Sequence, residues 1–174
     1  IFDKDDTERP RCEVGEICAR GPNVMLGYWG MEEASAEALR NGWLHTGDLG
    51  YMDEDGFVFI VDRVKDMIIS GGENIFSVEV ESAIYSHPAV QECAVVGIPH
   101  DEWVETVHAI VVPRQGHVLT EDELLSHCRE LIAGYKLPRS IEFRSEPLPI
   151  SGAGKILKNE LRAPYWGRMG RSVT

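Results

Sequence analysis

The feature of this sequence that most constrains its fold is a change of pattern close to Arg63–Asp66. Before this point the chain is β-prone with one helical stretch, whereas after it helical and strand-like segments alternate. The second part, residues 65–174, is long enough to bury a core of its own. We therefore predict an α+β fold in two parts: a β-rich part over 1–64, and a small domain with a short sheet flanked by helices over 65–174.

The β-rich part carries several local signals. Residues 13–20 are β-prone and precede the chain breaker at 21–23. Residues 32–40 are rich in helix formers, and the following Asn41-Gly42 is typical of a helix C-terminus. Asp55-Gly56 separates two apolar runs, which is the signature of a β-hairpin. These signals predict a strand, a helix and a hairpin in that order.

The second part alternates between helical and strand-like patterns. Its predicted elements are a helix over 78–87, strands over 90–98 and 106–112, a helix from Thr120 to Gly134 and a short strand over 141–144. Thr120 and Glu123 form a capping-box pattern at the start of the second helix. We expect the apolar residues of that helix, Leu131 included, to face the core.

Composition and charge narrow the class of protein. The formal net charge of −12 argues against a nucleic-acid partner, because binding a polyanion requires a basic surface. No apolar run approaches the roughly 20 residues of a membrane helix, so we expect no transmembrane segment and a cytoplasmic location. The 4 cysteines and 6 histidines show no metal-ligand spacing, which predicts no metal site.

A glycine-containing loop over 148–156 places Lys155 near the end of the chain. Such a loop can deliver a cation to a phosphate, although the same pattern is also typical of a solvated turn. A nucleotide P-loop is excluded, because that motif requires glycine in place of Pro149 and a hydroxyl in place of Ile156. The role of Lys155 therefore depends on the motifs that precede it.

Two such motifs occur upstream of Lys155, one over 42–50 and one over 62–74. In this order they resemble the C-terminal portion of the adenylate-forming superfamily, which includes acyl-CoA synthetases, adenylation domains of peptide synthetases and luciferases. The resemblance covers nearly the whole chain. It implies that residues 1–64 end a large AMP-binding domain and that 65–174 form the mobile C-terminal domain, an expectation that agrees with a chain beginning at isoleucine.

The resemblance also implies roles for charged residues. Lys155 would bridge the carboxylate and the nucleotide during adenylation, as the catalytic and ATP-binding lysine. Asp48 and Arg63 would hold the ribose of ATP or AMP, since a carboxylate accepts from vicinal hydroxyls and a guanidinium offers a fixed fork of donors. An ion pair of Arg63 with Asp62 or Asp66 is the structural alternative.

The same comparison assigns backbone roles. Lys65 would be the hinge about which the second domain rotates. Ser70, Gly71 and Gly72 would line the pantetheine channel of coenzyme A, because absent side chains let a backbone approach a ligand; a plain β-turn is the alternative. Asn74 is a possible adenylate contact, although its side chain is shorter than those of relatives. The segment 103–105 departs from the family pattern, and we assign it no ligand role.

The resulting functional hypothesis is an ATP-dependent acyl-CoA synthetase, an AMP-forming acid–thiol ligase. It would convert a carboxylic acid, with a fatty acid favoured, into an acyl-adenylate and then transfer the acyl group to coenzyme A. Mg²⁺ would accompany ATP, with its ligands in the large domain. The chain alone should be inactive, because both domains hold the reactants. The alternatives are an adenylation domain that loads a carrier protein and a non-catalytic binding module.

Overall fold

The computed structural model describes residues 1–167, so positions 168–174 of the predicted second domain lie outside the described residues. The chain divides into two compact units, one over Ile1–Lys65 and one that begins at Asp66. The division falls inside the Arg63–Asp66 stretch, one residue after the predicted boundary.

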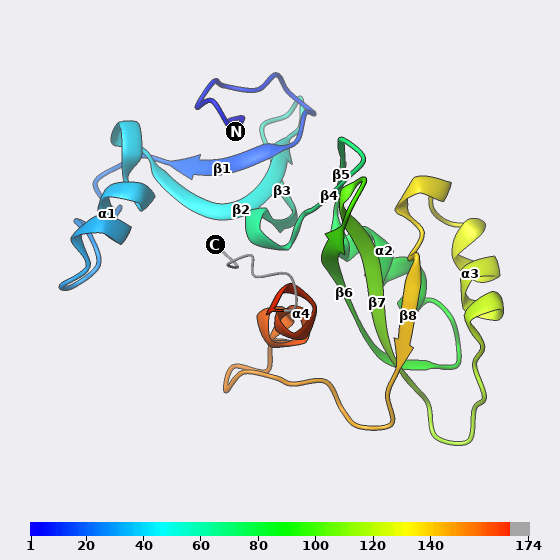
Figure 1. Ribbon diagram of the computed structural model, residues 1–174. Coiled ribbons are helices and arrows are strands. Elements are labelled where there is room, and N and C mark those ends of the chain that lie inside the picture. Colours follow the sequence, from blue (N-terminus) through cyan, green and yellow to red (C-terminus); the bar gives the residue numbers. More distant parts are fainter. Residues whose placement is uncertain (168–174) are drawn as a thin grey trace. The chain divides into compact units, whose positions relative to one another are not determined.

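The first unit is built on a three-stranded antiparallel sheet with the order β1-β2-β3 (Figure 1). Its elements are β1 (Gly15–Ala19), α1 (Glu32–Ala38), the 3-10 turn η1 (Arg40–Gly42), β2 (Leu44–Met52) and β3 (Val58–Arg63). In the predicted hairpin between β2 and β3, Gly56 adopts a φ of +90°, and the Asp53 N–H donates to the Phe57 carbonyl at 2.9 Å. The predicted strand, helix and hairpin are all present.

Little of the apolar surface of the first unit is buried. Within residues 1–65, all of them described, Leu49 is the one buried hydrophobic residue. Phe57 and Ile60 on the β3 side are 68% and 71% exposed, and Trp29 is fully exposed. A sheet this uncovered has almost no core of its own, and exposed apolar surface of this kind is typical of a region that packs against something else.

The second unit contains a mixed sheet with helices on both faces (Figure 1). Its elements are β4 (Ile68–Ser70), β5 (Glu73–Ile75), α2 (Ser77–Tyr85), β6 (Val90–His100), β7 (Val104–Pro113), α3 (Glu121–Arg129), the 3-10 turn η3 (Gly134–Lys136), β8 (Ser140–Phe143) and α4 (Lys158–Trp166). The order is β5-β4-β7-β6, and β8 pairs with β7 in parallel, whereas the other pairs are antiparallel.

The core of the second unit follows from the two-residue period of its long central strands. Cys93 and Val95 of β6 belong to the cluster that packs with residues of α2 and α3. The alternate residues Ala94 and Val96 pack with Leu161 of α4 on the opposite face. Both faces of the β6–β7 pair are therefore buried, which explains why these strands are β-branched and apolar almost throughout.

Helix α3 begins as predicted and ends earlier. The Thr120 hydroxyl accepts from the Glu123 N–H at 3.3 Å, and the Glu123 carboxylate accepts from the Thr120 N–H at 3.1 Å, which confirms the capping box. The helix stops at Arg129 instead of reaching Gly134, and Leu131 is 54% exposed. The expectation that Leu131 faces the core was wrong, because the helical register no longer holds beyond Arg129.

Candidate functional site

Asp48 and Arg63, the predicted ribose-binding residues, lie side by side in the first unit. They are directly paired in the register of β2 and β3, and Arg63 Nε donates to Asp48 Oδ1 at 2.9 Å. The side chain of Arg63 thus forms an ion pair with Asp48, and the backbone N–H of Arg63 donates to Asp62 Oδ1 at 2.8 Å. Both charged side chains are partly exposed, and a carboxylate has about four acceptor positions, so Asp48 keeps capacity for ligand hydroxyls.

Asp48 lies within β2, in a bulge over residues 46–48 where the pairing with β1 shifts register. Gly47 adopts a φ of +73°, a conformation that favours glycine. The Thr46 hydroxyl donates to the Ile17 carbonyl at 2.7 Å and accepts from the Asp48 N–H at 3.1 Å. The bulge is therefore hydrogen-bonded to β1, and the same hydroxyl holds the backbone of Asp48.

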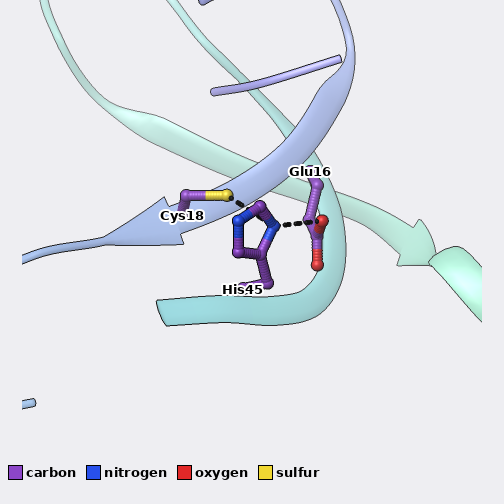
Figure 2. Close-up of side chains that lie close together, drawn as sticks. All are labelled: Glu16, Cys18 and His45. Atoms are coloured by element: carbon purple, nitrogen blue, oxygen red, sulfur yellow. Dashed lines mark hydrogen bonds and ion pairs between the residues drawn. The ribbon is translucent and has the colours of Figure 1, made fainter. Parts of the chain in front are cut away.

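Glu16, Cys18 and His45 come together beside this bulge (Figure 2). His45 Nδ1 donates to Glu16 Oε2 at 2.8 Å, and Cys18 Sγ lies 3.4 Å from the same nitrogen. Arg40 lies 3.2 Å from Glu16 Oε2 and 3.5 Å from Asp6. Residues 16 and 18 are two apart on a strand, and Cys18 pairs with His45 in the sheet. Sequence inspection did not find this group, because only the β1–β2 register brings it together.

The donor set of this cluster does not fit Mg²⁺. Magnesium prefers oxygen ligands in an octahedral arrangement, whereas Cys18 and His45 offer sulfur and nitrogen. Burial, and secondarily the Glu16 carboxylate, raises the pKa of Cys18 to about 11, so the thiol is protonated near neutral pH. The Arg40 guanidinium already neutralises Glu16. The cluster therefore acts as a hydrogen-bonded polar network, and the absence of a metal site stays a prediction.

The predicted glycine turn of the second unit joins β4 to β5. Gly71 and Gly72 have φ values of +60° and +87°, which is the pattern of a two-residue hairpin turn. The Gly71 N–H donates to the Trp103 carbonyl at 3.1 Å. Gly71 and Gly72 are exposed, as is Asn74 on β5, so backbone and side chain are both open to a ligand.

Trp103, in the segment that received no ligand role, has well-defined neighbours. The His100 ring stacks on it at 4.5 Å between centroids, and the Arg139 guanidinium lies 3.4 Å above the ring. Glu105 accepts from the Ile69 N–H at 2.9 Å, and burial raises the pKa of its carboxyl. Glu105 thus ties β4 to β7 as a structural residue.

Lys155 lies at an exposed turn before α4. The Ser151 N–H donates to the Lys155 carbonyl at 2.7 Å, and the Lys155 N–H donates to the Ser151 hydroxyl at 3.2 Å. Beyond the turn, Ile156 packs on the core. Lys158 forms a 2.7 Å ion pair with Glu81, and both side chains are only 15% exposed. The exposed side chain of Lys155 is therefore carried by a segment that is packed and ion-paired.

Lys65 is exposed in the 3-10 turn η2 (Val64–Asp66), where the chain passes from one unit to the next. Within the second unit, the turn that carries Lys155 and the turn between β4 and β5 lie at separate places (Figure 1). The structure thus brings Asp48 and Arg63 together and keeps Lys155 apart from Ser70, Gly71 and Gly72.

Comparison with known proteins identifies the family of this chain. Residues 79–155 match the model of the AMP-binding enzyme C-terminal domain. The chain belongs to the adenylate-forming superfamily. It is 54% identical to the feruloyl-CoA synthase of an Amycolatopsis species over 156 residues, which are 90% of this chain and 32% of that protein. It is 48% identical to the long-chain-fatty-acid–CoA ligase of Escherichia coli O6:H1, over 97% of this chain and 30% of the ligase.

Among solved structures, the chain resembles ATP-bound MatB from Rhodopseudomonas palustris. The TM-score is 0.87 at 39% identity, covering 94% of this chain and 33% of that one. The likeness confirms the predicted α+β fold and superfamily. The chain spans about a third of the length of the curated relatives that it matches. No helix among residues 1–167 is long and apolar enough to cross a membrane.

Proposed function

We propose that this chain is the C-terminal part of an AMP-forming acyl-CoA synthetase that makes an acyl-adenylate and passes the acyl group to coenzyme A. The observation that carries the proposal is the Asp48–Arg63 pair, held in register on adjacent strands at 2.9 Å. This pair offers acceptors and donors to the vicinal hydroxyls of a ribose. The exposed apolar side of the first unit supports packing against a large domain that completes the nucleotide site.

Lys155 supplies charge for the first step. Attack of a carboxylate on the α-phosphate of ATP brings two anions together and expels pyrophosphate, so a cation between them lowers the barrier. An ammonium about 4 Å from one unit charge contributes on the order of 4 kcal/mol at an effective dielectric of about 20, or about a thousandfold in rate. The exposed position of Lys155 at a tight turn suits insertion into such a site.

The second step uses another face of the same unit. After rotation about Lys65, the open backbone of Ser70, Gly71 and Gly72 would line the channel of coenzyme A, and the thiolate would displace AMP. Asn74, exposed on the neighbouring strand, remains a proposed contact to the adenylate. Mg²⁺ would be held outside the described residues, because the one mixed cluster of ligand donors found among them does not suit it.

The relatives differ in the acid for which they are named: one is named for ferulate and another for long-chain fatty acids. We propose a fatty or aryl carboxylic acid, in the cytoplasm. Loading of a carrier protein and a non-catalytic binding role are the alternatives.

The test uses the full-length polypeptide encoded by the intact reading frame that contains this chain. We expect ATP–pyrophosphate exchange that depends on one class in a panel of fatty and aryl acids, followed by AMP release that depends on coenzyme A. The isolated 174-residue chain should catalyse neither step. Acyl transfer to a phosphopantetheinyl protein but not to coenzyme A would favour carrier loading, and no exchange with any acid would remove the enzyme proposal.

A further inference from the structure

We infer that Glu16 is the positioning residue of the ribose-binding bulge of β2: its carboxylate fixes the Thr46–Asp48 backbone so that Asp48 points at the ribose hydroxyls. This inference rests on the proposed function, because it assigns Glu16 to the same nucleotide site. It concerns a residue that does not itself touch the nucleotide and acts through Asp48.

The first support is the set of hydrogen bonds to the two carboxylate oxygens. Oε1 of Glu16 accepts from the Gly47 N–H at 3.0 Å, directly before Asp48. Oε2 accepts from His45 Nδ1 at 2.8 Å and from Arg40 Nη2 at 3.2 Å. The Glu16 side chain is 15% exposed. One largely buried carboxylate thus connects the bulge to His45 and Arg40, and hydrogen bonds to a charged acceptor are stronger than neutral ones.

The second support is the conformation of the bulge. Gly47 has a φ of +73°, in the left-handed region, and an added Cβ there would meet no atom within 4 Å. Hydrogen bonds hold this backbone: Glu16 accepts from Gly47, and Thr46 bonds to the Ile17 carbonyl and to the Asp48 N–H. We expect removal of the Glu16 carboxylate to free the middle of the bulge while the strand pairing of Asp48 with Arg63 persists.

A structural metal is the competing explanation for the cluster of Glu16, Cys18 and His45. The positive charge of Arg40, 3.2 Å from the shared carboxylate oxygen, opposes a second cation at that point. The hydrogen-bonded network therefore accounts for the cluster better.

The experiment measures discrimination between ATP and 2′-deoxy-ATP or 3′-deoxy-ATP by the full-length protein, as the ratio of kcat/KM values for adenylation. This ratio is independent of the folded fraction, because misfolded molecules drop out of both measurements. Loss of one or two hydrogen bonds to a charged group predicts about 10- to 100-fold discrimination in the parent protein. Asp48→Ala should reduce the ratio to about 1, since it removes the acceptor itself.

Glu16→Ala should lower the discrimination ratio about tenfold, because the variant loses the hydrogen bond to the Gly47 N–H. The loss should appear mainly as a higher KM for ATP. Glu16→Gln keeps an oxygen for the Gly47 N–H and should retain part of the ratio. Glu13→Ala, an exposed change on the same segment, should leave the ratio as it is. Adding Glu16→Ala to Asp48→Ala should cost nothing further in discrimination, because Glu16 acts only through the contact that Asp48 makes.

The results of these variants distinguish a failure of the Glu16 inference from a failure of the proposed function. If Asp48→Ala abolishes discrimination while Glu16→Ala keeps it, the inference about Glu16 fails and the proposed function stands. If Asp48→Ala also keeps full discrimination, the ribose role and with it the proposed function fail. Stoichiometric zinc in the purified protein, lost in Cys18→Ser together with discrimination, would overturn the hydrogen-bond account in favour of a metal.

Discussion

Lys155 combines an exposed side chain with a buried support. Its turn is closed by hydrogen bonds to Ser151, and the chain that follows is anchored by Ile156 and by the Lys158–Glu81 ion pair. An exposed lysine costs little to change, whereas its anchors are part of the core. A substitution at Lys155 therefore tests chemistry without disturbing the fold.

We expect Lys155→Ala, in the full-length protein, to reduce adenylation by about a thousandfold, because the variant loses the charge that offsets the two reacting anions. Thioester formation from supplied acyl-adenylate should stay within about threefold of the parent, since that step does not need the lysine. Pyrophosphate exchange and a coenzyme A assay measure the two steps separately. Lys155→Arg is the matched control for charge, and equal losses in both half-reactions would contradict the assigned role.

At the level of elements, the second unit is held together by a polar network as well as by its two apolar clusters. His108 on β7 accepts or donates through Nδ1 with the Ser140 hydroxyl of β8 at 2.7 Å, and its Nε2 lies 2.9 Å from the Tyr165 hydroxyl of α4. Tyr165 also donates to Glu142 at 2.5 Å. Burial lowers the pKa of His108, an effect that exceeds the opposing attraction of Glu142. The network joins three elements around a histidine that favours its neutral form.

This arrangement predicts a pH dependence of stability. Because the pKa of His108 is lower in the folded than in the unfolded state, its contribution is fully present above the ordinary histidine pKa of about 6.5 and is lost as pH falls through the lowered value. The denaturant midpoint of the second unit should therefore fall between pH 7.5 and pH 5. His108→Gln should show a smaller fall in the denaturant midpoint. Part of the fall should remain, because burial also lowers the pKa of His87. His117→Gln, at an exposed position, is the control, and an unchanged fall in His108→Gln would refute the assignment.

At the scale of the whole molecule, the division between the units coincides with a short 3-10 turn that contains Lys65. The proposed residues for adenylation and for coenzyme A binding lie on separate turns of the second unit, so one fixed orientation of that unit would not serve both steps. A change of orientation about the junction is the simplest means of presenting each turn in sequence.

Lys65→Pro in the full-length protein tests this reasoning, because proline restricts φ to about −65° and so limits rotation at the junction. We expect adenylation to stay within about threefold and coenzyme A transfer to fall by at least about tenfold, since only the second step requires the rotated state. Lys65→Ala, which leaves the backbone free, should behave as the parent. A proline variant that performs both steps at parental rates would place the hinge elsewhere or remove the need for one.

The sequence by itself determined the features that depend on residues a few positions apart. The Asp55-Gly56 hairpin, the Thr120–Glu123 capping box and the motif around Asp48 were legible because their signals are local and their hydrogen bonds close short loops. Superfamily membership was legible for the same reason, since it rests on short motifs in a fixed order. Helix α4 was not predicted. Pro164 within it disfavours a helix, and contacts with distant parts of the chain stabilise it: Leu161 is buried against the sheet, and Tyr165 bonds to residues of β7 and β8.

The tertiary structure alone decided which distant residues act together. Glu16 and the Gly47 backbone are 31 positions apart, and Cys18 and His45 are 27 apart; the register of β1 on β2 makes them neighbours. The resemblance predicted that Asp48 and Arg63 hold the same ribose, and the register of β2 on β3 shows how two separate motifs bring them side by side. A shift of one residue in either pairing would turn these side chains to the opposite face. The motifs thus predicted which chemical groups are present, and strand register determined which of them lie side by side.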